Sequence, residues 1–135
     1  MKVFATTYFI SLLFLLIFDA IWLLFLVKDF VSKSIGHLMA ENVKIAPVLI
    51  FYPLYALAIT FLVVLPAING NFSPSKVLLL GGLLGLAAYG AYDLTNHATL
   101  KSWPAAMSVL DMVWGMSMTG LASLLSFYLV NLFIK

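Results

Sequence analysis

Long hydrophobic stretches dominate the chain, and polar residues separate them at regular intervals. Each stretch is longer than 20 residues, and about 20 residues of helix are enough to cross the hydrocarbon core of a bilayer. Turn-forming residues at 69–74 and a Ser-Trp-Pro sequence at 102–104 mark helix ends and starts. The pattern therefore predicts four transmembrane helices, at about 5–27, 46–67, 77–100 and 104–133.

The first hydrophobic stretch resembles a signal peptide only in its opening residues. Lys2 is followed by an apolar run that continues to Val27, which is longer than the hydrophobic core of a signal peptide. No small-residue cleavage site follows the run. We therefore interpret it as a first helix that is not cleaved.

The connection between the first two helices, residues 28–46, has polar and apolar residues at helical spacing. This pattern predicts a short amphipathic helix that lies on the membrane surface, and a plain polar loop is the alternative. The apolar positions are Val31, Ile35, Leu38 and Met39, and the polar positions are Lys33, His37, Glu41 and Lys44.

Composition supports a membrane protein. Of the 135 residues, 64% are hydrophobic and 9% are charged, whereas a soluble domain carries about 25% charged residues. The length predicts one integral membrane domain over residues 1–135, in the all-α class: a four-helix transmembrane bundle surrounded by lipid. The absence of cysteine excludes disulfides and thiolate metal sites. A net charge of +2 with scattered lysines does not favour a nucleic-acid partner.

Lysines flank the predicted helices on both sides of the membrane, and there is no arginine. An even number of spans places both ends of the sequence on one side. Because the two sides carry similar numbers of lysines, the positive-inside rule does not decide the orientation. Lys2, Lys76 and Lys135 lie on one predicted side, and Lys28, Lys33, Lys44 and Lys101 lie on the other.

Three aspartates interrupt the hydrophobic stretches: Asp19, Asp93 and Asp111. An aspartate at the centre of a membrane helix costs roughly 2.5 kcal/mol or more, so such residues commonly mark functional sites. Asp19 precedes Lys28 by nine residues, Asp93 precedes Lys101 by eight, and Asp111 follows Lys101 by ten. This counting predicts one layer of carboxylates roughly 10–14 Å below a single surface.

No arginine or mid-membrane lysine is available to neutralise this layer. His97 is the nearest titratable base, about one turn closer to the surface. Like charges in a medium of low dielectric constant cannot all ionise, so either a proton is retained or a bound cation supplies the missing charge. If that cation is a metal ion, the three aspartates are its candidate ligands.

Aromatic and polar residues surround the predicted layer. Each of two aspartates has a tryptophan three residues later on nearly the same helix face, Trp22 after Asp19 and Trp114 after Asp111. The alternative is structural: the aspartates tie helices together through hydrogen bonds, and the aromatic rings only pack. Besides the aspartates, the candidate ligand-binding residues are Trp22, Tyr52, Tyr55, Tyr92, Asn96, His97 and Trp114.

Small residues indicate which helix faces meet. Gly81-x-x-x-Gly85 in the third predicted helix allows close approach of a neighbouring helix. In the fourth helix, a stripe of small and polar residues falls within an arc of about 80° and is expected to face inward. Its members are Ser108, Asp111, Gly115, Thr119, Ala122 and Ser126.

Several segments resemble those of a family of small bacterial membrane proteins known only as a domain of unknown function. They include Tyr-Asp-Leu-Thr-Asn at 92–96, Ala-Thr-Leu-Lys at 98–101, Phe-Asp-Ala-Ile-Trp at 18–22, Phe-Tyr-Pro-Leu-Tyr at 51–55 and Asp-x-x-Trp-Gly at 111–115. The resemblance covers nearly the whole chain, and it implies four helices and a bacterial inner-membrane location. It implies no activity. His97 and Gly90 depart from the family's usual residues, which weakens the case for an essential His97.

Three functions are compatible with these features. The first is binding or movement of a small cationic ligand, a metal ion or a proton at the Asp/aromatic layer, with a homodimer expected for transport. The second is an accessory subunit that pairs with another membrane protein. The third is a small enzyme that acts on a lipid or isoprenoid by proton transfer. No nucleophile–base motif or phosphate-binding loop supports an enzyme, and no cofactor is predicted.

Overall fold

The computed structural model describes residues 1–134, so the predicted boundary residue Lys135 lies outside the described residues. Within this range the chain is helical and contains no strand. Four helical units are long and apolar enough to span a membrane, which confirms the predicted all-α class of four transmembrane helices. These units cover Lys2–Leu26, Ile45–Asn69, Pro74–Thr99 and Ala105–Phe133, within three residues of every predicted boundary.

Two of the four units contain a wider, π-helical turn. The first consists of α1 (Lys2–Ile21) and the π segment η1 (Trp22–Leu26). The second consists of α3 (Ile45–Ile59), the π segment η3 (Thr60–Val64) and α4 (Leu65–Asn69). Pro66 lacks an N–H, so the α-helical bond to the Leu62 carbonyl cannot form, and the widened turn lies just before it.

The other two units, α5 (Pro74–Thr99) and α6 (Ala105–Ile134), are continuous helices packed against each other. Ser73 caps α5 by accepting a hydrogen bond from the Lys76 backbone N–H at 3.4 Å. A Cβ atom added at Gly81 would lie 2.5 Å from the Ser123 Oγ, and one added at Gly85 would clash with the Gly115 carbonyl. The predicted close approach at these glycines is therefore confirmed.

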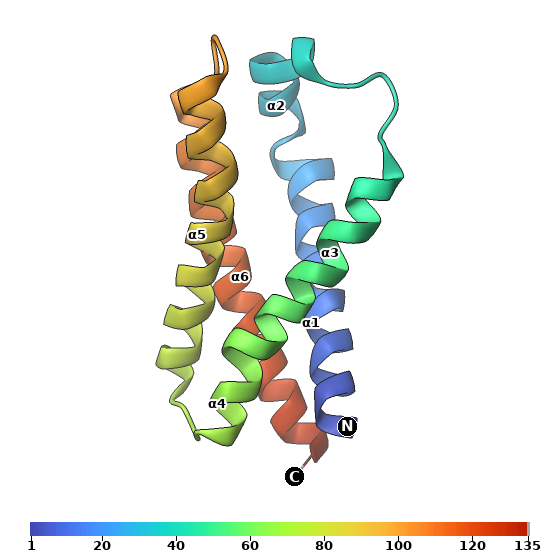
Figure 1. Ribbon diagram of the computed structural model, residues 1–135, viewed down its shortest axis with the longest axis vertical. Helices are drawn as coiled ribbons and strands as arrows, with labels where there is room; N and C mark the ends of the chain where they lie inside the picture. The colour runs from blue at the N-terminus through green and yellow to red at the C-terminus, as the bar shows by residue number, and fades with distance from the viewer. Residues whose placement is uncertain (135) are drawn as a thin grey trace.

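The helix α1 packs against both α6 and α3, whereas α3 lies against α5 only near η3 (Figure 1). The start of α1 and the end of α6 lie together at the end of the molecule opposite α2, and that half is called the lower half from here on. The main hydrophobic core is concentrated there and includes Leu15, Ile59, Val64, Ala67 and Val77. In the upper half, α3 leans away from α5.

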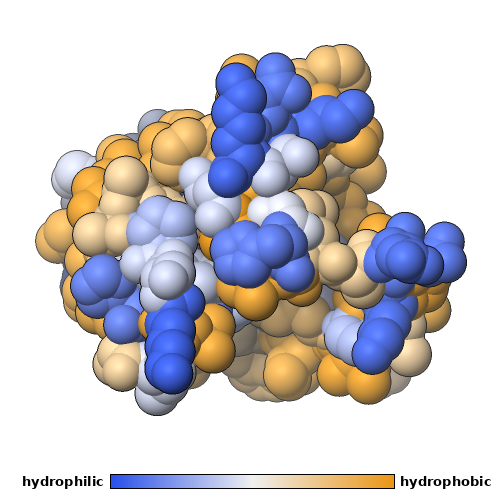
Figure 2. Space-filling model, turned by 90° about the horizontal axis from the view of Figure 1, so that it is seen from above, coloured by the Kyte–Doolittle hydropathy of each residue, from blue (hydrophilic) through white to orange (hydrophobic). Residues whose placement is uncertain are grey.

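The predicted amphipathic helix is confirmed as α2 (Lys28–Ile35), followed by a single turn, η2 (Gly36–Leu38). It is shorter than the pattern suggested, because residues 39–44 are not helical. From above, polar side chains form separate groups at this end, and hydrophobic side chains cover the flanks (Figure 2). Large apolar side chains on those flanks are exposed, for example Leu49 at 67% and Leu79 at 69%, as expected for surfaces that contact lipid.

Candidate functional site

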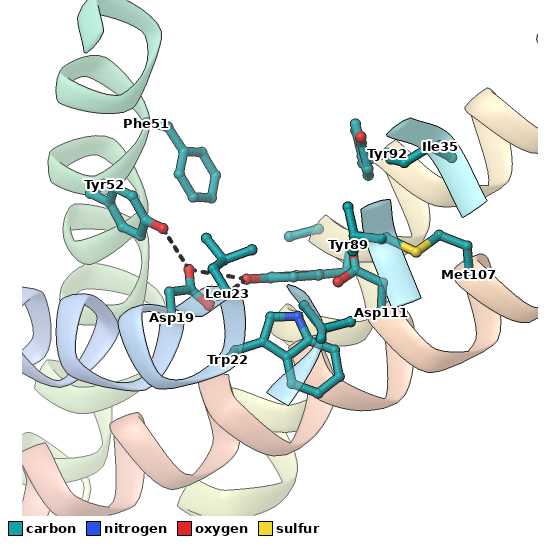
Figure 3. A pocket seen from close by; sticks show the side chains of 13 residues that line it. Asp19, Trp22, Leu23, Ile35, Phe51, Tyr52, Tyr89, Tyr92, Met107 and Asp111 are labelled. Carbon is teal, nitrogen blue, oxygen red and sulfur yellow. Dashed lines mark hydrogen bonds between the residues drawn. The ribbon is translucent and has the colours of Figure 1, made fainter. Parts of the chain in front are cut away.

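A cavity of about 370 Å³ lies in the upper half of the bundle (Figure 3). Residues from α1, α3, α5 and α6 form its walls, and residues of α2 border it at the membrane surface. Aromatic rings and two carboxylates therefore share one pocket, which is partly open to the outside. The lining residues are Asp19, Trp22, Leu23, Val27, Val31, Ile35, Phe51, Tyr52, Ala88, Tyr89, Tyr92, Met107 and Asp111.

The carboxylate of Asp19 accepts hydrogen bonds from three other helices. The Tyr52 hydroxyl of α3 donates to Oδ2 at 2.9 Å, and the Trp114 indole N–H of α6 donates to Oδ1 at 3.1 Å. The Tyr89 hydroxyl of α5 lies 3.4 and 3.5 Å from the two oxygens. Asp19 is only 6% exposed, so this group of neutral donors replaces water around a buried carboxylate and joins all four spanning units.

The two tryptophans exchange partners relative to the expectation from sequence. Trp114 of α6 binds Asp19 of α1, and Trp22 of η1 lies beside Asp111 of α6. The two indole rings stack with centroids 4.5 Å apart and planes within 4° of parallel. The three-residue spacing therefore brings each indole close to the depth of the aspartates. Each indole, however, interacts with the aspartate of the other helix.

Asp93 differs from Asp19 because its buried carboxyl group receives no hydrogen bond from a tyrosine, a tryptophan or the backbone, and instead lies beside the Asp111 carboxyl group. It is 0% exposed, and both of its oxygens are unpaired among residues 1–134. Its nearest charged neighbour is Asp111, which is half-buried and faces the cavity. The Ser108 hydroxyl donates to the Asp93 backbone carbonyl at 3.3 Å and accepts from the Trp103 indole at 2.9 Å. These two hydrogen bonds hold the segment after α5, which contains Trp103, over the Asp93–Asp111 pair.

The three aspartates do not form a single cluster. Asp19 binds Tyr89 and Trp114, which lie about one helical turn deeper than Asp93 and Asp111 on their respective helices. The predicted common layer is therefore two adjacent levels, with the Asp93–Asp111 pair above Asp19. In the described part of the chain, no three Asp, Glu, His or Cys side chains are arranged to hold a metal ion.

The predicted site residues divide into two sets. Asp19, Trp22, Tyr52, Tyr92 and Asp111 line the cavity. The other five lie outside its lining. The Tyr55 hydroxyl contacts the Thr119 hydroxyl instead, with 2.8 Å between the oxygens. Trp114 contacts Asp19, and Asp93 contacts Asp111, on the side away from the cavity. Asn96 and His97 lie nearer the membrane surface, where His97 is exposed.

Sequence reasoning did not select the most central ring, Tyr89, as a site residue. Tyr89 is four residues before Asp93, which places both on the inward face of α5. This spacing alone could have identified Tyr89 as a site residue. Val31 and Ile35 of α2 were recognised only as a surface stripe. Their contribution to the cavity depends on the turn at Trp22–Leu26, which directs α2 over the bundle.

Four hydrophobic spanning helices with lipid-facing flanks define this chain as an integral membrane protein. A family model described as "Predicted membrane protein (DUF2177)" matches residues 4–128, so the chain belongs to that family of predicted membrane proteins. Neither the comparison with curated proteins nor the comparison with solved structures finds a match. A function must therefore be inferred from the chain's own residues.

Proposed function

We propose that this protein binds a small organic cation with a hydrophobic substituent in the upper cavity. The observation that carries the proposal is the combination of two carboxylates, Asp19 and Asp111, with aromatic rings in one lining. No lysine or histidine among residues 1–134 contributes to that lining. A cation would therefore meet negative charge and π faces together, which is the usual arrangement for organic ammonium ligands.

The dimensions and the position of the cavity fit this ligand class. A volume of about 370 Å³ is within the range of roughly 300–1,000 Å³ typical of small-molecule sites. The surface-proximal wall is apolar and comes from Val27, Val31 and Ile35, whereas the charges lie deeper. An amphiphilic cation that partitions into the membrane surface could thus enter with its charged group directed inward.

The two aspartates have different proposed roles. Asp19 already has three neutral donors, so it supplies a fixed negative charge in the wall. Asp111 faces the cavity beside the unpartnered Asp93, and two adjacent carboxyl groups without a basic neighbour favour a retained proton or an added cation. We therefore assign Asp111 as the direct partner of the ligand. Trp22 and Tyr92 are the proposed π contacts.

Binding of benzyltrimethylammonium to the detergent-solubilised protein, measured by isothermal titration calorimetry, tests the proposal. We expect Asp111→Asn to weaken binding at least tenfold. Asp29→Asn is the matched control, because Asp29 is exposed on α2 and does not line the cavity, and it should leave the affinity unchanged. Equal affinity in the wild type and Asp111→Asn would reject the assignment, and absence of wild-type binding would reject the function.

An accessory role is the second candidate, and the bonding of Asp19 favours it. A carboxylate with donors from three other helices is a strong interhelical tie, and such a tie needs no ligand. This role predicts stable co-purification with another membrane protein from cells of the source organism. Recovery as a partner-free protein that binds the cation would favour the first candidate. For the cation-binding function, we also propose a bacterial inner-membrane location, and a homodimer if the protein transports its ligand.

A further inference from the structure

Two hollows on the outer surface of α5 and α6 play no part in the proposed cation site. One, called the lower hollow, lies beside the turn between α4 and α5 at the lower end of the molecule (Figure 1). The other, called the groove, lies between α5 and α6 and extends from the start of α5 toward the middle of the membrane. We propose that together they bind one phospholipid, with its anionic headgroup in the lower hollow and an acyl chain in the groove.

The groove has the lining expected of an acyl-chain site. Its volume is about 670 Å³, and only Ser75 and Ser117 contribute polar side chains to its otherwise apolar walls. On α5 the lining extends from Ser75 to Leu86, which is about 16 Å along the helix axis. Gly82 forms part of the floor, because an added Cβ atom would meet only atoms of Met116, at 3.5 Å. A long, thin hydrocarbon chain therefore fits this space.

Large side chains at the groove favour a flexible chain over a second transmembrane helix. Leu79, Leu83 and Leu121 are exposed and line the groove. Close contact between membrane helices depends on small residues at the crossing point, whereas an acyl chain can bend around projecting leucines. We therefore assign the groove to a lipid and not to a second copy of this chain.

The lower hollow and the groove adjoin each other, so one ligand can occupy both. Pro74 lines the lower hollow, and the next residue, Ser75, lines the groove. On α6, Ser117 and Leu121 of the groove and Tyr128 of the lower hollow fall within an arc of about 40°. The two spaces thus follow one another along one face, from the surface toward the membrane centre. A phospholipid has the same order of polar and apolar parts.

The lower hollow offers a positive charge and hydrogen-bonding groups to a headgroup. Its volume is about 350 Å³, and Asn71, Tyr128 and Asn131 contribute polar side chains to its lining. The Lys76 ammonium group lies 3.6 Å from the centre of the Phe72 ring, which also lines the hollow. This cation–π contact holds the charge at the edge of the hollow. A phosphate group there would meet an ammonium group and neutral donors together.

The distribution of charge favours an anionic headgroup over a zwitterionic one. Lys2 and Lys76 lie at the lower end, as basic residues do in sites for anionic lipids. A choline group would find no carboxylate with which to pair at this end, because the five acidic residues of the chain lie around the upper cavity or at the upper surface. They are Asp19, Asp29, Glu41, Asp93 and Asp111.

Titration of the detergent-solubilised protein with lipid, followed by native mass spectrometry, tests the headgroup assignment. The probes are phosphatidylglycerol and phosphatidylcholine with identical acyl chains. We expect one phosphatidylglycerol per chain, bound at least fivefold more tightly than phosphatidylcholine. Lys76→Gln should abolish this preference. Lys101→Gln is the matched control, because Lys101 is exposed at the opposite surface, and it should keep the preference. Equal affinity of the wild type for the two lipids would overturn the proposal.

A second set of variants tests the acyl groove. Gly82→Leu places a large side chain in the groove and should weaken binding of both lipids at least tenfold. Ala87→Leu is the matched control, because Ala87 is exposed on α5 and lies outside the groove. Ser117→Leu fills the groove from α6 and provides the same test if Gly82→Leu misfolds. Unchanged lipid affinity in both filled variants overturns the proposal. A lipid-free wild-type dimer that Gly82→Leu dissociates also overturns it, because the groove would then bind a second copy of the chain.

Discussion

The upper and lower halves of this bundle use the same four spanning units in different ways. In the lower half, small side chains such as Gly81, Gly85 and Ser123 let the helices meet at backbone distance. In the upper half, the rings of Trp22, Tyr52 and Tyr89 stand between the helices. The size of inward-facing side chains therefore decides where the helices pack closely and where aromatic rings hold them apart.

Proline strengthens this difference. Pro53 lies inside α3 and cannot donate the helical hydrogen bond to the Leu49 carbonyl. The upper turns of α3 are correspondingly exposed and stand apart from α5 (Figure 1). A rigid lower half can support such an open upper half, because the spanning units remain joined below it. The following changes test this division of labour, from the largest expected effect to the smallest.

Loss of the Asp19 carboxylate should have the largest effect on stability, because it removes hydrogen bonds to three helices at the junction of the two halves. At roughly 0.6–1.7 kcal/mol for each interhelical bond, Asp19→Ala should destabilise the protein by about 2–5 kcal/mol. Thermal unfolding in detergent is the measurement. Asp29→Ala, at an exposed site on α2, should leave the unfolding temperature unchanged. An unfolding temperature of Asp19→Ala equal to that of the wild type would show that the tie is not needed.

A matched pair of glycine substitutions tests the close contact in the lower half. Gly85→Ala introduces a methyl group against the Gly115 backbone carbonyl, which cannot rotate away, whereas Gly82→Ala meets Met116 at an ordinary 3.5 Å. Overpacking of this kind costs about 1–3 kcal/mol. We expect Gly85→Ala to lower the unfolding temperature and Gly82→Ala to leave it nearly unchanged. Similar results for the two variants would contradict the described helix crossing.

The spans and the close approach of α5 and α6 could be predicted from sequence, because hydrophobic length and glycine spacing act along one helix. The partners of the polar groups could not. The spacing of Asp19 and Trp22 indicated a same-helix pair, but the indole that binds Asp19 is Trp114. Helix rotation and relative depth decide such pairs, and both depend on packing between helices. The role of α2 was missed for the same reason, since a surface helix and a cavity wall have the same amphipathic pattern.

Asp93 provides a contrast with Asp19, because its carboxyl group is not held by donors from three other helices. Its oxygens have no N–H or O–H donor within residues 1–134, so Asp93→Asn changes one member of the Asp93–Asp111 pair without breaking a bond to a tyrosine or tryptophan. We expect a change in stability of less than about 1 kcal/mol, measured by the same unfolding assay. A loss as large as that of Asp19→Ala would show that Asp93 also holds the helices together, and the two carboxylates would then share one structural role.

The smallest effect is expected at α2, where only the cavity wall changes. Val31→Thr keeps the shape of the side chain but places a hydroxyl in an apolar part of the lining. We expect cation affinity to fall about threefold to fivefold, which corresponds to roughly 0.7–1 kcal/mol, with little change in unfolding temperature. Val43→Thr is the matched control, because Val43 is 75% exposed and lies outside the cavity. If both variants bind benzyltrimethylammonium as the wild type does, α2 is only a surface connection. If only Val31→Thr binds more weakly, α2 forms part of the ligand-binding surface in the open upper half. The two halves then differ in ligand recognition as well as in packing.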